Sequence, residues 1–157
     1  MSLSGATIDV INPKTGRLIG AVAAAQAADI DRAVEAARTA FRGWRRTPPA
    51  QRANILWRIA DLIEKHGEEL ATLEALDVGM PIDLARELTA PRCADTFRYY
   101  AGWCSKLEGA TTQTSLMDVH AYTLREPYGV CEQIVPGNAP VKMASWKLAP
   151  CLATGNV

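Results

Sequence analysis

Cysteine has the most reactive side chain in this sequence, because its thiolate can act as a nucleophile or bind a metal ion. The chain has four cysteines: Cys93, Cys104, Cys131 and Cys151. No two of them have C-x-x-C spacing, and neither histidine stands at a metal-ligand interval from one of them. The pattern therefore predicts no metal site and four buried, reduced thiols, as expected of a cytoplasmic protein.

Asn138 is a second residue of chemical interest, within the run Pro136-Gly137-Asn138-Ala139-Pro140. Asn caps helix N-termini well, because its side-chain oxygen accepts a hydrogen bond from an N–H of the first turn. Proline is also frequent at the first position of a helix. On these residues alone, a helix cap is the favoured role of Asn138.

The segments on either side of Asn138 predict the first two parts of a βαβ unit. Val130–Val135 is largely apolar and predicts a strand. Val141–Thr154 predicts a buried helix, in which Met143 and Trp146 are available for packing. A tight loop between such a strand and such a helix is typical of an α/β domain.

The end of this helix carries two further signals. Pro150 lies inside the helical pattern, so we expect the helix to kink or end there. Gly155-Asn156 is typical of a helix C-terminal cap. Val157 would then begin a parallel strand that pairs with Val130–Val135.

The first part of the chain predicts a β-hairpin. The turn signature Asn12-Pro13-Lys14-Thr15-Gly16 separates two short apolar runs, Ile8–Val10 and Leu18–Val22. Pro fixes φ and Gly accepts the positive φ that closes such a turn. After Gly109 the pattern becomes extended again, with a loop over 110–115 and a strand over 121–125.

Residues 24–108 predict mostly helix. Apolar residues recur at spacings of three and four from Ile30 to Trp44, which marks one helical face. We expect Thr47 to cap a second helix and Gly67 to end it in a left-handed conformation. The stripe of that helix is Ala53, Leu56, Ala60 and Ile63. Further helices are expected over 68–77, over 83–88, and from Pro91 to near Gly109.

The composition excludes several classes of protein. The chain has 157 residues, 48% hydrophobic and 22% charged, which is close to the globular average and far from that of a disordered chain. Its 17 Lys and Arg balance 17 Asp and Glu, whereas a dedicated nucleic-acid binder is normally basic. No apolar run approaches the ~20 residues that span a membrane, and the first residues are not typical of a signal peptide.

Taken in order along the chain, these segments resemble the NAD(P)-dependent aldehyde dehydrogenase superfamily. The runs that carry the resemblance are Ile11–Gly16, Asp29–Arg38, Thr96–Trp103, Arg125–Val130, Gln133–Asn138, Met143–Pro150 and Ala153–Asn156. The resemblance implies a truncated, aldehyde dehydrogenase-like α/β fold. We expect an N-terminal hairpin and helical part over 1–109, an oligomerisation hairpin region over 110–126, and the start of a Rossmann-type parallel sheet over 127–157.

The resemblance also implies a mechanism. In the family a cysteine thiolate attacks an aldehyde, hydride passes to NAD or NADP, and a glutamate activates the water that releases a carboxylic acid. Asn138 matches the side-chain amide that stabilises the tetrahedral oxyanion, a role that the resemblance favours over the helix cap. Ile134, Val135, Pro136 and Gly137 match the segment that lines the cofactor, and Met143 and Trp146 match positions in the substrate tunnel. The residues themselves are equally compatible with a core strand, a turn and ordinary packing.

Several departures from the family's pattern affect these expectations. The family commonly has Trp at the position of Gly137, Phe at that of Ala139, and an apolar residue at that of Lys142. The family's catalytic cysteine and glutamate lie after the matched region, and none of the four cysteines here matches the nucleophile's motif. We therefore expect this chain to be the N-terminal part of an aldehyde dehydrogenase and to be inactive alone.

Two other classes of function remain open. One is a naturally short, non-catalytic subunit or assembly module, which would pair with full-length subunits through the strand near Ala121–Arg125. The resemblance implies that full-length members form dimers or tetramers. A helical binding module unrelated to catalysis is the third hypothesis, and rests only on the amphipathic helices of 24–108.

Overall fold

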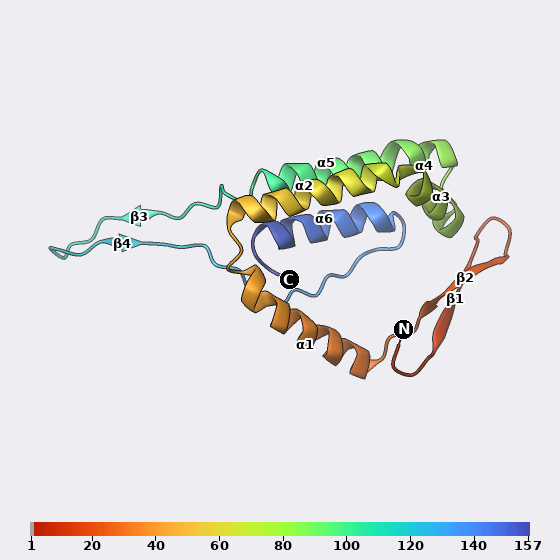
Figure 1. Cartoon of the computed structure of the whole chain (residues 1–157), viewed down its shortest axis with the longest axis horizontal. Helices are drawn as coiled ribbons and strands as arrows, with labels where there is room; N and C mark the ends of the chain where they lie inside the picture. The colour runs from red at the N-terminus through yellow and green to blue at the C-terminus, as the bar shows by residue number, and fades with distance from the viewer. Residues whose placement is uncertain (1) are drawn as a thin grey trace.

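The computed structural model describes residues 2–157, and its centre is a group of three packed helices (Figure 1). The elements in chain order are β1 (Thr7–Ile11), β2 (Leu18–Ala23), α1 (Ala27–Trp44), α2 (Pro49–Lys65), α3 (Gly67–Val78), α4 (Ile82–Leu88), α5 (Ala90–Ala101), β3 (Thr111–Thr112), β4 (Ala121–Tyr122) and α6 (Pro140–Ala153). Within this described part of the chain, no helix is long and apolar enough to cross a membrane.

The core lies where α2, α5 and α6 meet. It is built mainly from alanines, with Leu56, Phe97 and Cys104 as its larger members. Small side chains let helix backbones approach closely, so the three helices can share one narrow core. The predicted stripe of α2 is confirmed: Leu56 and Ala60 are buried, and Ala53 and Ile63 pack against the cluster.

The predicted N-terminal hairpin is confirmed. Strands β1 and β2 pair antiparallel, with Ile8 opposite Val22. The side chain of Asn12 organises the turn, because its Oδ1 accepts hydrogen bonds from the backbone N–H groups of Lys14 and Thr15. Gly16 has the positive φ (68°) that the turn requires.

Three boundary predictions in the helical part are wrong. Thr47 does not cap α2, because its hydroxyl donates back to the carbonyl of Gly43 and Pro48 is the N-cap. Gly67 does not end α2 but begins α3, where a Cβ on it would lie 3.2 Å from the Cβ of Ala90. Helix α5 ends at Ala101 rather than near Gly109, and turns follow.

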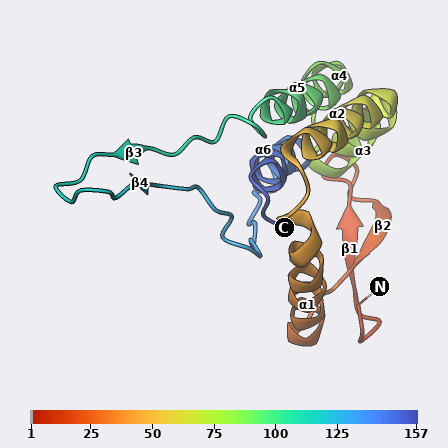
Figure 2. The ribbon, with the colours of Figure 1, turned by 60° about the vertical axis from the view of Figure 1, so that its left-hand side comes forward.

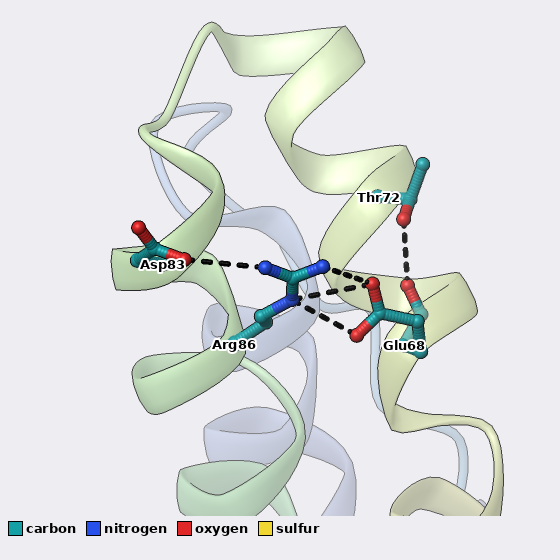
Figure 3. Close-up of polar contacts among 4 residues, drawn as sticks. All are labelled: Glu68, Thr72, Asp83 and Arg86. Carbon is teal, nitrogen blue, oxygen red and sulfur yellow. Dashed lines mark hydrogen bonds and ion pairs between the residues drawn. The ribbon is translucent and has the colours of Figure 1, made fainter.

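A cluster of charged side chains joins α4 to α3 (Figure 3). Nη2 of Arg86 lies 2.6 Å from Oε1 of Glu68, and Nη1 lies 3.2 Å from Oδ1 of Asp83. The hydrogen bond from Arg86 lowers the pKa of the Glu68 carboxyl. All three side chains are at least half exposed, so the cluster orients the short helix without adding a buried charge.

The hairpin of β3 and β4 extends away from the helices in both ribbon views (Figures 1 and 2). Thr111 pairs with Tyr122 and Thr112 with Ala121. The segment 110–115, predicted as a loop, therefore includes a short strand, and strand β4 is shorter than the predicted 121–125. Nearly all residues of this hairpin are exposed, so nothing within the described residues covers it.

The last part of the chain contains the beginning of the predicted βαβ unit. The N–H of Val157 donates to the carbonyl of Gly129 at 3.0 Å, and the N–H of Cys131 donates to the carbonyl of Val157 at 2.7 Å. Two such bonds flanking one residue are the pattern of a parallel ladder. Within residues 2–157, the rest of Val130–Val135 pairs with no strand.

The C-terminal cap of α6 is confirmed and the predicted early end at Pro150 is wrong, whereas a kink at Pro150 stays a prediction. The helix continues to Ala153, three residues beyond Pro150. Gly155 has φ 86°, and the N–H groups of Gly155 and Asn156 donate to the carbonyls of Leu152 and Cys151. These two bonds form a Schellman cap. Asn156 also accepts a hydrogen bond from the N–H of Gly129, which fixes the helix end against the predicted strand.

The chain exposes much more surface than a compact protein of its mass. A compact monomer of this size exposes about 7,700 Å², whereas this chain exposes 10997 Å². Helix α1, for example, has no buried residue. Much of this surface is apolar and includes Ile8, Ile30, Leu124 and Ile134.

Candidate active site

The predicted cofactor segment is an exposed stretch that leads into α6. Ile134 is 83% exposed, Pro136 and Gly137 are also exposed, and Val135 is half-buried. Among residues 2–157, the backbone N–H and C=O groups of 132–138 pair with no other part of the chain. A Cβ added to Gly137 would meet nothing within 4 Å. The segment therefore offers open space and free backbone groups to a ligand.

Asn138 does not cap α6, so the interpretation favoured by the residues alone is wrong. The N-cap is Ala139, and the helix has no side-chain cap hydrogen bond. Asn138 is exposed, and no hydrogen bond of its amide is present within the described residues. Its two N–H donors are thus available to an acceptor outside these residues.

The start of α6 makes the surroundings of Asn138 favourable for negative charge. Pro140 occupies the first position of the helix, and Met143 donates the first helical hydrogen bond, to the carbonyl of Ala139. The N–H groups of Val141 and Lys142 therefore have no helical acceptor. Such free N–H groups carry the positive end of the helix dipole.

A cleft of about 610 Å³ lies between α5 and α6. It is lined by Arg92, Asp95, Thr96, Tyr99, Tyr100, Lys142 and Trp146. The predicted tunnel residue Trp146 is half exposed in this cleft. Met143, the other predicted tunnel residue, is half-buried and is not among the lining residues, nor are residues 134–138.

Sequence reasoning missed the side of this cleft that α5 supplies. Arg92, Asp95, Thr96 and Tyr99 recur at spacings of three, one and three, which places them on one face of a helix. The opposite face is the buried stripe that includes Ala94, Phe97 and Ala101. The polar face of α5 could be recognised in the sequence. The sequence did not indicate which helix would supply the other side of the cleft.

The environment of three thiols makes Cys93, Cys104 and Cys151 weak nucleophile candidates. Burial raises the pKa of Cys93 and of Cys104. Burial, together with the neighbouring Cys131, raises the pKa of Cys151 to about 11. A thiol attacks as its thiolate, so raised pKa values disfavour the reaction. Cys93 and Cys104 are buried as predicted, whereas Cys131 and Cys151 are partly exposed.

Comparison with known proteins places these features in a family. The family model described as "Aldehyde dehydrogenase family" matches residues 1–157. The chain is 48% identical over 156 residues to a putative aldehyde dehydrogenase, DhaS, of Bacillus subtilis, covering 98% of this chain and 31% of that protein. It is 45% identical to an aldehyde dehydrogenase of Alternaria alternata, again covering 31% of the relative.

Solved structures give the same result. A putative aldehyde dehydrogenase from Burkholderia cenocepacia matches 99% of this chain with a TM-score of 0.96 and 46% identity, over 32% of that chain. The NAD+ complex of the Bacillus cereus aldehyde dehydrogenase matches with a TM-score of 0.95 and 44% identity, over the same share. The 157 residues thus span about a third of the length of these relatives and correspond to their N-terminal portion.

Proposed function

The chain belongs to the aldehyde dehydrogenase family, and from this premise we propose that it supplies the oxyanion donor and part of the cofactor surface for oxidising an aldehyde to a carboxylic acid. The nucleophilic cysteine and the glutamate base come from residues beyond these 157. The chain alone forms no product, because these residues lack the nucleophilic cysteine and the glutamate base that the reaction needs. We place the enzyme in the cytoplasm and expect it to be an oligomer.

The observation that carries the proposal is the free amide of Asn138 at the positive end of α6. When a thiolate adds to an aldehyde, the carbonyl oxygen becomes an oxyanion. A fixed N–H donor lowers the energy of that state more than that of the neutral aldehyde, and therefore accelerates the reaction. The two free N–H groups in the first turn of α6 favour the same charge.

The segment 134–137 fits a nicotinamide cofactor. Its exposed apolar side chain at Ile134 suits the face of a ribose or a nicotinamide ring, and the absence of a side chain at Gly137 leaves room for it. The cofactor, when bound, accepts the hydride from the substrate carbon. Support for NAD comes from the NAD+ complex of the Bacillus cereus relative.

Substitution of Asn138 tests this role in a joined enzyme. In the joined enzyme, this chain replaces the matched N-terminal third of the Bacillus cereus aldehyde dehydrogenase, which supplies the remaining residues. Asn138→Ala is expected to lower kcat by a factor of about 10²–10³, because one oxyanion donor is lost. Asn138→Asp should lower kcat further, since a carboxylate repels the oxyanion.

Asn54→Ala is the matched control, because Asn54 is an exposed Asn on α2, outside both the cleft and the segment 134–138. Its kcat should equal that of the unchanged joined enzyme. An Asn138→Ala enzyme that is folded and retains full kcat would show that the amide has no role in the reaction.

An assembly role is the second candidate, favoured by the projecting β3–β4 hairpin and the large exposed surface. Unpaired strand edges and apolar faces are the usual means by which subunits pair. Mixing the chain with a full-length family member distinguishes this candidate. If the two do not co-elute in gel filtration, the assembly role is wrong.

A further inference from the structure

We propose that the cleft between α5 and α6 binds the negatively charged tail of the substrate, so that the enzyme prefers aldehydes that carry a carboxylate. The inference rests on the proposed function, because it needs the aldehyde group to reach Asn138. It adds a chemical class of substrate and two residues, Arg92 and Lys142, that select it.

The charge of the cleft favours an anionic ligand. Arg92 on α5 and Lys142 on α6 are two cations, and Asp95 is the one carboxylate among the seven lining residues. Two positive charges and one negative charge leave a net charge of +1. Among residues 2–157, neither cation forms an ion pair within 4.0 Å. Both cations are therefore available to an anion that enters the cleft.

Lys142 occupies an unusual position for a cation. It lies in the first turn of α6, where the helix dipole disfavours a cation. Its neighbours on the helix, Val141 and Met143, are apolar. An anionic ligand would interact favourably with both the ammonium group and the helix end, and would offset this unfavourable placement of the lysine.

The side chain of Lys142 is held at the cleft. Its Nζ lies 4.8 Å from the centre of the Trp146 ring, a cation–π geometry. Across the cleft, the rings of Tyr99 and Tyr100 pack edge to face with their centres 5.1 Å apart. The aromatic rings offer a surface for the hydrocarbon part of a substrate, and the cations lie beside that surface.

Lys142 and Trp146 follow Asn138 closely in the sequence. Lys142 follows Asn138 by four residues and Trp146 follows it by eight. Asn138 lies before α6, which begins at Pro140, and Lys142 lies in the first turn of that helix. A small aldehyde with its carbonyl at Asn138 would therefore extend its carboxylate past the start of α6 toward Lys142.

The experiment compares two aldehydes in the joined enzyme. The substrates are 4-formylbenzoate and 4-methylbenzaldehyde, which have the same ring and differ in the charge of the para substituent. We expect kcat/KM to be about tenfold higher for 4-formylbenzoate, the effect of two partly exposed ion pairs. The unmodified Bacillus cereus enzyme, assayed in parallel, shows how much of this preference the chain brings.

Two further measurements assign the preference to the cleft. The double variant Arg92→Met with Lys142→Met should reduce the ratio of the two kcat/KM values to near one. Lys147→Met is the matched control, because Lys147 is an exposed lysine on the same helix that does not line the cleft. It should keep the ratio. High salt should lower the ratio of the two kcat/KM values in the unchanged joined enzyme. This measurement does not depend on the folding of a variant.

The outcomes separate the two proposals. If both aldehydes are oxidised with equal kcat/KM, or the neutral aldehyde is preferred, the anion site is wrong and the proposed function stands. If the preference is present but the double variant retains it, the cleft is not its source and the inference is also wrong. If the folded joined enzyme oxidises neither aldehyde, the proposed function itself fails, and the inference fails with it.

Discussion

Burial controls the chemistry of the cysteine side chains in this chain. Cys93 and Cys104 lie in the helical core, and Cys151 lies on α6 beside Cys131. Removing a thiolate from water is unfavourable, so the pKa values of Cys93, Cys104 and Cys151 are raised. Packing is thus the role that the structure supports for these three residues.

Alkylation kinetics test this environment directly. With the pKa of Cys151 at about 11, about one Cys151 side chain in a thousand is a thiolate near pH 8. We expect iodoacetamide to modify Cys151 slowly there, and the rate to rise about tenfold for each pH unit until the pH approaches the pKa. Mass spectrometry of tryptic peptides gives the rate at each cysteine.

Unfolding the chain in concentrated guanidinium chloride provides the control, because all four cysteines should then react at similar rates. Rapid modification of Cys151 in the folded chain near neutral pH would contradict the raised pKa and reopen the question of a reactive thiol.

Asn138 shows how far single residues could be interpreted from the sequence. The run Asn138-Ala139-Pro140 is typical of a capped helix, yet Ala139 takes the cap position and the amide stays free. Capping depends on the backbone angles of a single residue, which local composition does not determine. The oxyanion role was reached only through the resemblance, and it stays a prediction. The cleft residues Arg92 and Asp95 could not be assigned because they depend on packing between α5 and α6.

At the scale of elements, apolar periodicity predicted most helices and the first hairpin. The stripes of α2 and α5 form the observed core, since a 3.6-residue repeat reports which face is buried. The predicted helix boundaries were wrong where another interaction determined the end of the helix. Gly67 lacks a side chain because α5 passes close to it, rather than because α2 ends in a left-handed residue. Pairing of Val130–Val135 needs neighbouring strands, so its sequence alone could not produce a sheet.

The junction of α2, α5 and α6 is the element-scale feature that most determines stability. Leu56 is fully buried in it, so Leu56→Ala should lower the free energy of unfolding by roughly 2–5 kcal/mol. Ile55, the next residue, is 39% exposed, and Ile55→Ala should cost much less than Leu56→Ala. Guanidinium unfolding of the chain, followed by far-ultraviolet circular dichroism, measures both. Equal losses for the two variants would show that this core does not hold the helices together.

At the scale of the whole molecule, the most informative feature is the large exposed surface area. The exposed area of the chain, 10997 Å², exceeds that of a compact monomer of this mass, about 7,700 Å². Many apolar side chains therefore meet no partner within these residues. Helix α1, the β3–β4 hairpin and the segment 132–138 all contribute exposed residues. The relatives of this chain are about three times its length, and we infer that in such proteins further residues cover these faces.

The account's central claim is that these residues form one part of an aldehyde-oxidising site whose nucleophile lies elsewhere. The most direct test is NADH formation, followed by absorbance, with an aldehyde and NAD. The account predicts steady NADH formation by the joined enzyme and none by the purified 157-residue chain under the same conditions. Steady NADH formation by the chain alone, or none by a folded joined enzyme, would contradict the claim.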